Sequence, residues 1–177
     1  AMLVRMAENG QSPLVRVTAD AESLGEQPVF NTIAEIRGSE KPDEYIVLSA
    51  HFDSWDGSSG ATDNATGTVT MMEAIRILKQ VYPNPKRSIV VGHWGGEEQG
   101  LLGSRGHIAK HPEENAKISA VLVHDGGTNY VAGITGLEAM IPAFKTAFKA
   151  VQNANLALPF KIRQIPRFRP IGSDHDS

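Results

Sequence analysis

Three continuous apolar runs constrain the fold of this chain more than any other feature. They lie at residues 45–50, 88–93 and 118–123. Strands that are apolar without alternation are buried on both faces, which is typical of parallel sheets covered by helices. Segments with helical periodicity separate and follow these runs. The sequence therefore predicts an α/β fold, a mostly parallel mixed sheet flanked by helices on both sides. The expected helices are residues 64–81, 101–110 and 137–151.

Shorter patterns predict the remaining elements. Alternating apolar residues favour strands at residues 14–18 and 31–37, and a late strand is expected at residues 160–165. Residues 3–8 are expected to be the end of a helix. The polar residues 41–44 include a Pro and predict a turn before the first apolar run.

The composition limits the class of protein. The 177 residues suit one domain, and 41% of them are apolar, which is enough for a core. The net charge is −3 and the Lys and Arg residues are scattered, so no basic surface for nucleic acid or an acidic membrane is predicted. No stretch approaches the roughly 20 apolar residues that span a bilayer. Because the chain has no Cys, any metal ion must be held by His and carboxylates.

Acidic and histidine residues follow the apolar runs at the points where the strands are expected to end. His51 and Asp53 follow the first run, Glu97 and Glu98 follow the second, and Asp125 follows the third. A further acid, Asp63, opens the expected helix after the first run. The carboxyl ends of parallel strands meet at one edge of a sheet. Several carboxylates gathered there repel each other unless a cation lies between them. The pattern therefore predicts a metal site and metal-assisted hydrolysis.

Each of these residues also has a plainer interpretation. Asp63 can be an ordinary helix N-cap, Asp125 a turn residue, and His51 a surface side chain. Adjacent glutamates usually lie on a solvated helix face. Here, however, Glu97 and Glu98 directly follow a buried strand and two glycines. Neighbouring side chains diverge, so one can bind metal while the other acts as a general base.

The last residues of the chain contain another His between acids. Asp174, His175 and Asp176 have the residue types of a metal site. The simpler interpretation is a mobile polar tail.

Taken in order, these motifs resemble those of the co-catalytic di-zinc metallopeptidases of the aminopeptidase and glutamate carboxypeptidase superfamily. Within it, the chain is most similar to the plasma glutamate carboxypeptidase group, also in residues 30–38. The motifs that carry the resemblance are SAHFDSWD at residues 49–56, GATDNATG at 60–67, WGGEEQGLLGS at 94–104 and HDGGT at 124–128.

The resemblance implies a three-layer α/β/α fold, two zinc ions and a role for each residue. His51 and Asp125 would bind one zinc, and Glu98 the other. Asp63 would bridge both zinc ions and be joined to Asn64 by a cis peptide bond. Glu97 would be the general base, and Asp53 would orient His51.

The same resemblance implies that residues 1–177 are a single but incomplete catalytic domain, truncated at its C-terminus. In the family a further histidine ligand of the second zinc lies downstream of the segment that matches residues 172–175. An inserted protease-associated domain is expected to be absent too, and the first residues are expected to mark a domain boundary rather than a signal peptide. His175 is the residue of this chain that can take the place of the missing ligand.

The function implied is that of a zinc-dependent exopeptidase, which hydrolyses dipeptides or short peptides with a water activated by two metals. Alternatives are a catalytically inactive binding relative, an acyltransferase of the glutaminyl cyclase type, or a deacylase of amino-acid conjugates. The resemblance further suggests a secreted or periplasmic protein that forms homodimers. The residue that would hold a peptide terminus is not assigned, since Arg163, Arg167 and Arg169 are expected to be solvated loop charges.

Overall fold

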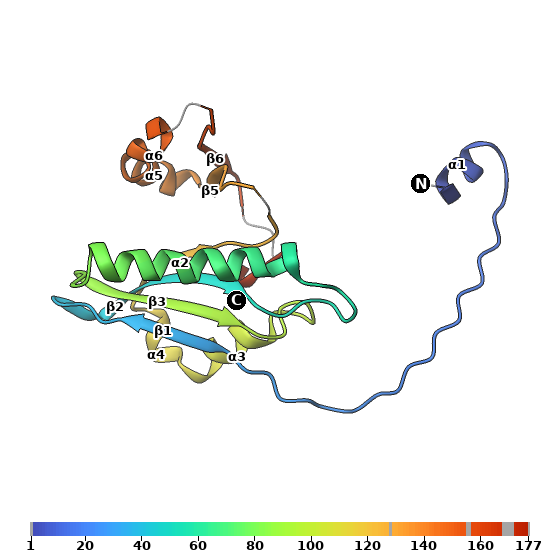
Figure 1. Ribbon diagram of the computed structural model, residues 1–177, viewed down its shortest axis with the longest axis horizontal. Coiled ribbons are helices and arrows are strands. Elements are labelled where there is room, and N and C mark those ends of the chain that lie inside the picture. Colours follow the sequence, from blue (N-terminus) through green and yellow to red (C-terminus); the bar gives the residue numbers. More distant parts are fainter. Residues whose placement is uncertain (1, 128, 155–156, 168–171, 177) are drawn as a thin grey trace.

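The computed structural model of the protein describes residues 2–127, 129–154, 157–167 and 172–176. Its centre is a four-stranded sheet in which the strand order is β1-β3-β2-β4 (Figure 1). Strand β2 pairs in parallel with β3 and with β4, whereas β1 runs antiparallel to β3. The mostly parallel mixed sheet predicted from the apolar runs is therefore confirmed. The strands are β1 (Thr32–Ile36), β2 (Lys41–His51), β3 (Arg87–Trp94) and β4 (Ile118–Val123).

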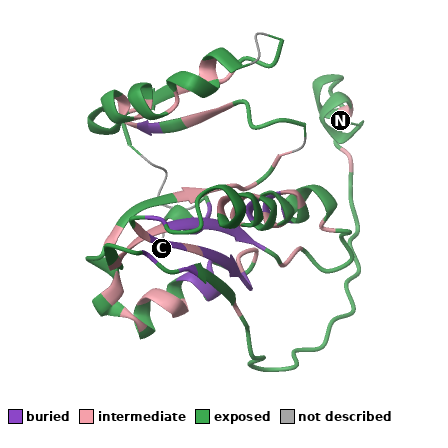
Figure 2. Ribbon diagram, turned by 60° about the vertical axis from the view of Figure 1, so that its left-hand side comes forward, coloured by how far each residue is buried: buried purple, intermediate pink, exposed green. Residues whose placement is uncertain are grey.

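Helices cover both faces of this sheet. Helix α2 (Thr66–Val81) lies on one face, and α3 (Leu102–Lys110) and α4 (Pro112–Asn115) lie on the other (Figure 1). The buried residues gather in the central strands and the part of α2 that faces them (Figure 2). Within the described residues, no helix has the length and apolar character needed to cross a bilayer. The core consists of Ile36, Leu48, Ala50, Met71, Ile89 and Val91, with Ala74, Ile75, Leu78 and Leu122 packed against it.

A second, two-stranded parallel sheet follows the first and joins β5 (Gly133–Leu137) to β6 (Lys161–Ile165). The helix predicted over residues 137–151 is present, but in three pieces that start at Glu138 and end at Ala154. Leu137 ends β5, and the following helical residues are broken at Phe148, whose backbone is not helical. A proline is favoured in the first turn of a helix, so Pro142 marks the start of a new helix. The pieces are η2 (Glu138–Met140), α5 (Ile141–Ala147) and α6 (Lys149–Ala154).

The chain begins with α1 (Met2–Glu8), which lies at the end of a long extended segment (Figure 1). The strand predicted at residues 14–18 is wrong, because the side chains of Leu14 and Val17 are 101% and 82% exposed. An alternating apolar sequence forms a strand only where a second strand is available to form backbone hydrogen bonds with it. The turn predicted at residues 41–44 is wrong too, since β2 already starts at Lys41 and its pairing is irregular up to Tyr45.

The chain enters α2 through the irregular turn η1 (Ala61–Ala65), in which Asp63 and Asn64 are not helical. The helix therefore starts at Thr66, two residues later than residue 64. Gly67 is buried at this start. A Cβ atom on Gly67 would overlap the side-chain oxygen of Asn64 and the carbonyl oxygen of His124. Only glycine lets α2 approach the end of β4 so closely.

Replacing Gly67 by Ala is expected to lower the free energy of unfolding by about 1–3 kcal/mol, the usual cost of overpacking. Gly106→Ala in α3 is the matched control, because no atom lies within 4 Å of the added Cβ. That control is expected to raise the free energy of unfolding by up to about 1 kcal/mol, since Ala is the better helix former. Urea unfolding measures both, and equal stabilisation by the two changes would contradict the close approach.

Candidate metal centre

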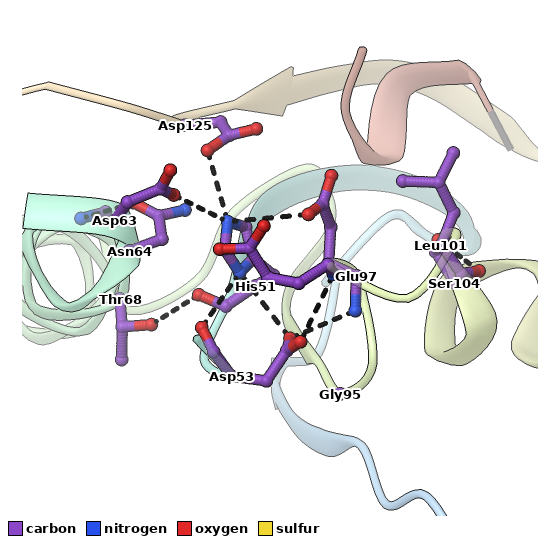
Figure 3. Close-up of polar contacts among 12 residues, drawn as sticks. His51, Asp53, Asp63, Asn64, Thr68, Gly95, Glu97, Leu101, Ser104 and Asp125 are labelled. Atoms are coloured by element: carbon purple, nitrogen blue, oxygen red, sulfur yellow. Dashed lines mark hydrogen bonds and ion pairs between the residues drawn. The ribbon is translucent and has the colours of Figure 1, made fainter. Parts of the chain in front are cut away.

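The strand-end residues come together at the carboxyl edge of the main sheet (Figure 3). His51 is the last residue of β2, and Asp125 lies two residues beyond β4. Asp63 reaches the same edge from η1, the turn before α2. One nitrogen of His51 and one oxygen of each of these two carboxylates lie within 4.8 Å of one another. The fold therefore brings together three residues that are separated by up to 74 positions in the sequence.

The imidazole of His51 is the centre of this group and is only 1% exposed. Its Nε2 lies 3.1 Å from Oδ1 of Asp63 and 3.2 Å from Oδ1 of Asp125. Its Nδ1 lies 3.2 Å from the carbonyl oxygen of Asp53. Because a carbonyl oxygen only accepts, Nδ1 is the nitrogen that donates its hydrogen. In a neutral imidazole, Nε2 would then present its lone pair to two carboxylates, which is unfavourable unless a proton or a metal ion lies there.

Where no metal ion is bound, a proton on Nε2 of His51 supplies the positive charge between the carboxylates. Burial lowers the pKa of His51, but the hydrogen bond to Asp125 and the charges of Asp125, Glu97 and Asp53 outweigh it and raise the pKa to about 9. Burial raises the pKa of Asp125, but its hydrogen bond to His51 and the charge of His51 outweigh burial and hold this pKa below its usual value. The imidazolium therefore stands where the surrounding carboxylates favour a cation.

These donor atoms fit a zinc ion. Imidazole nitrogen and carboxylate oxygen are zinc ligands, and a zinc site with three protein ligands keeps a position for water or substrate. A ligating histidine also commonly donates its other N–H to a carbonyl or carboxylate, as Nδ1 of His51 does to Asp53. Within the described part of the chain, neither Glu98 nor the exposed His175 belongs to the three-residue group. Their roles as ligands of a second zinc stay predictions.

Glu97 lies beside the group without being part of it. Its side chain is 11% exposed, and its Oε2 is 3.9 Å from Nε2 of His51. Burial raises the pKa of Glu97 to about 7 in the metal-free protein. A carboxylate with a pKa near neutrality exchanges protons efficiently with a reacting group. Burial and the charge of Asp63 also raise the pKa of Glu98.

Asp53 connects the ends of β2 and β3. Its Oδ1 accepts the backbone N–H of Glu97 at 3.0 Å, and its Oδ2 accepts that of Glu98 at 3.2 Å (Figure 3). The same carboxylate lies 3.5 Å from Nδ1 of His51, farther than the carbonyl oxygen of Asp53 itself. The carboxylate of Asp53 therefore holds the backbone of both glutamates, a task that the sequence did not indicate.

The side chains of Asn64 and Thr68 support the centre. Asn64 is 1% exposed, and its side-chain amide donates to the carbonyl oxygen of His124 at 2.9 Å while its Oδ1 accepts the N–H of Gly67. Thr68 donates its hydroxyl hydrogen to the carbonyl oxygen of His51 at 2.9 Å. The peptide bond between Asp63 and Asn64 is cis, as the family resemblance implied.

The end of the chain is not a solvated tail. The turn η3 (Asp174–Asp176) packs against β2 and β4, and Ser173 and Asp174 are only 4% and 6% exposed. Burial raises the pKa of Asp174 to about 6, although Ser104 faces its carboxylate and acts in the opposite direction. The charge of Asp174 also reaches Glu97. The sequence did not assign this buried carboxyl group a role.

Two cavities lie beside the residues that follow β4. One of about 530 Å³ lies between the start of α2 and the residues after β4, with Ala61, Val69 and Tyr130 in its wall. The other, of about 430 Å³, is lined by Asp125 and Arg163 among others. Arg163 is exposed, as expected, but it belongs to β6 rather than to a loop, and it lines a cavity. Arg169 lies outside the described residues.

Without metal, the protein is expected to become less stable as the pH rises. The pKa of Glu97 is raised from 4.5 to about 7, and that of His51 from 6.5 to about 9. The folded state therefore binds more protons than the unfolded state between these values, and the free energy of unfolding falls from pH 4.5 to pH 9. Thermal unfolding in a chelator measures this slope.

The variant His51→Asn is the control for the upper part of that pH range. Above neutral pH its slope is expected to be much smaller than that of the wild type, because the raised pKa of His51 is gone. A melting temperature of the wild type that stays constant or rises with pH would contradict the crowding of carboxylates around His51.

Known proteins are similar to this chain in sequence and in fold. Carboxypeptidase Q from Rattus norvegicus is 32% identical over 161 residues, which are 90% of this chain and 34% of that protein. The crystal structure of a peptidase M28 precursor from Shewanella amazonensis matches with a TM-score of 0.71 and 28% identity, over 82% of this chain and 32% of that one. A zinc aminopeptidase from Bacillus subtilis matches with a TM-score of 0.61 and 25% identity, over 76% of this chain and 34% of that one.

The chain thus spans about a third of the length of these relatives. The resemblance predicted from the motifs is confirmed by all three comparisons. The family model described as peptidase family M28 matches residues 31–177, a stretch that contains every residue of the candidate metal centre. The chain therefore belongs to peptidase family M28.

Proposed function

We propose that the protein is a zinc-dependent exopeptidase that hydrolyses dipeptides or short peptides. The observation that carries this proposal is the position of Nε2 of His51, which lies within 3.2 Å of an oxygen of both Asp63 and Asp125. Glu97, whose side chain is 11% exposed, lies 3.9 Å from the same nitrogen. Membership of a metallopeptidase family supports peptide hydrolysis as the chemistry of this arrangement.

The ligands for two zinc ions are proposed residue by residue. His51 and Asp125 would hold one ion, and Asp63, whose side chain is 56% exposed, would supply an oxygen to each ion. Glu98 would hold the second ion, and His175 is a candidate for a further ligand. When bound, zinc lowers the pKa of a coordinated water toward about 7 and polarises a substrate carbonyl.

Glu97 would be the residue that moves the proton. Its carboxylate would take a proton from the attacking water and deliver it to the nitrogen of the leaving amine. Because the side chain is 11% exposed, bulk water competes little for that proton. Asp53 positions Glu97 through the backbone N–H groups of both glutamates. Glu97, which follows β3, is therefore held in place by Asp53, which follows β2.

The wider setting is proposed from the family resemblance. Residues 1–177 would belong to one catalytic domain that acts on peptides in a secreted or periplasmic protein, and the protein would form homodimers. The net charge of −3 and the scattered basic residues argue against nucleic acid or an acidic membrane as a partner.

Changing Glu97 to Gln is expected to lower turnover of a dipeptide substrate by about 10²–10⁴-fold, the usual contribution of a general base. The zinc content should stay unchanged, because Glu97 is not proposed as a ligand. Elemental analysis and a hydrolysis assay on the same preparation measure both quantities. Glu22→Gln removes the same charge from an exposed residue outside the site and is the matched control.

Near-normal turnover of Glu97→Gln would remove Glu97 from its proposed role. The assay also separates the proposal from two other activities. Release of ammonia from a peptide with an N-terminal glutamine, without hydrolysis of dipeptides, would replace it by an acyltransferase of the glutaminyl cyclase type. A zinc-loaded wild type that releases neither product would indicate a binding protein.

A further inference from the structure

We propose a second, peripheral site for a divalent metal ion at the junction of α3 and α4. Its ligands are His111, Glu113 and Glu114. His107 is not a ligand, but its imidazole lies next to the carboxylate of Glu114. One ligand atom of each of the three residues lies within 4.8 Å of the other two. In the described part of the chain, the only other group of His and carboxylate residues with this geometry is the candidate metal centre around His51.

The distances within this group suit a bound ion better than direct hydrogen bonds. Nδ1 of His111 lies 3.8 Å from Oε1 of Glu113 and 3.7 Å from Oε1 of Glu114. Direct N–H···O hydrogen bonds are shorter, at about 2.7–3.2 Å. Zinc bonds to nitrogen and oxygen are about 2.0–2.2 Å long, so tetrahedral ligands lie about 3.3–3.6 Å apart. A shift of a few tenths of an ångström would therefore bring each of the two carboxylate oxygens to the distance from Nδ1 of His111 that a shared ion requires.

Glu114 faces two imidazoles with its two oxygens. Oε1 faces His111, while Oε2 lies 3.6 Å from Nε2 of His107. Ligating carboxylates are commonly held by hydrogen bonds from residues outside the coordination sphere. The His107 ring is itself packed between Trp94, at 5.2 Å between centroids, and His111, at 4.7 Å. His107 can therefore fix the orientation of Glu114 while that residue binds the ion.

The local sequence explains why these side chains meet. His107 and His111 are four positions apart at the end of α3 and lie on the same side of it. Pro112 then starts α4 at once, so that Glu113 and Glu114 fall in its first turn. The short connection brings both carboxylates back toward the histidines.

The group favours a cation at neutral pH. Glu113 and Glu114 are adjacent carboxylates, and the ion pairs that the structure shows for them are with histidines. A cation between the two carboxylates would offset their mutual repulsion. One imidazole and two carboxylates suit Zn²⁺, and Co²⁺ or Mn²⁺ to a lesser degree. The side chains of His111 and Glu113 are 43% and 64% exposed, so an ion can enter from solvent without opening the fold. The fourth position would hold water.

This site is separate from the candidate metal centre. Helix α3 starts next to the carboxyl edge of the sheet and runs back along its face, so α4 lies away from that edge (Figure 1). An ion there would tie α3 to α4 and, through His107, to Trp94 at the end of β3. We therefore assign it a structural role rather than a catalytic one.

The test is a titration of the protein with Zn²⁺ alone, measured by isothermal titration calorimetry in the wild type and in single variants. His111→Ala is expected to lose one equivalent of bound zinc. Glu114→Gln should lose the same equivalent, and His107→Ala should bind it about 10–100-fold more weakly, as for other residues that support a ligand. Lys110→Ala, a neighbouring change on α3, is the control and should keep it. Circular dichroism verifies that each variant is folded.

The variant His51→Asn separates this proposal from the proposed function. It is expected to lose zinc from the candidate metal centre and to keep the equivalent that depends on His111. Equal stoichiometry and affinity in the wild type, His111→Ala and Glu114→Gln would overturn the peripheral site. The proposed exopeptidase activity would be unaffected by that result, because it depends on a different zinc equivalent.

Discussion

The gathering of carboxylates around Nε2 of the buried His51 is the interaction on which the rest of the structure depends. Like charges at such short range repel strongly where water is excluded. In the metal-free protein the proton on His51 offsets this repulsion, and its pKa of about 9 reports how strongly the site attracts positive charge. A metal ion would satisfy the same electrostatic demand and leave Nε2 as a ligand. The arrangement of charges alone therefore favours a cation at this site, whatever reaction the site carries out.

The fold holds this unfavourable arrangement with contacts that lie outside the ligand group. Thr68 binds the carbonyl oxygen of His51, and Asn64 binds that of His124. Asp53 holds the backbone after β3 from a position just beyond β2. These bonds tie η1, α2 and the loops to the ends of three parallel strands. Side chains on rigid strand ends keep their geometry better than side chains on free loops, which suits a site that must oppose its own repulsion.

Much of this could be predicted from the sequence, and the failures have physical causes. Continuous apolar runs predicted β2, β3 and β4 correctly, and the parallel sheet then brought His51, Asp63 and Asp125 to one edge. Long-range contacts left no local signal. Asp53 lies 44 residues from Glu97, and the buried Asp174 looked like part of a polar tail. Periodicity also failed where strand pairing was missing, at residues 14–18, and it did not show that the helical segment after β5 is divided into pieces. The cluster around His111 needed the spatial position of α4.

The most direct test of the central claim is the position of zinc in crystals of the protein, determined from anomalous diffraction at the zinc absorption edge. The account predicts a peak at bonding distance, about 2.0–2.2 Å, from Nε2 of His51 and from an oxygen of both Asp63 and Asp125. A second peak between Asp63 and Glu98 would complete the proposed pair. A zinc-saturated crystal with no peak next to Nε2 of His51 would contradict the account, because the carboxylates would then be balanced by the proton alone.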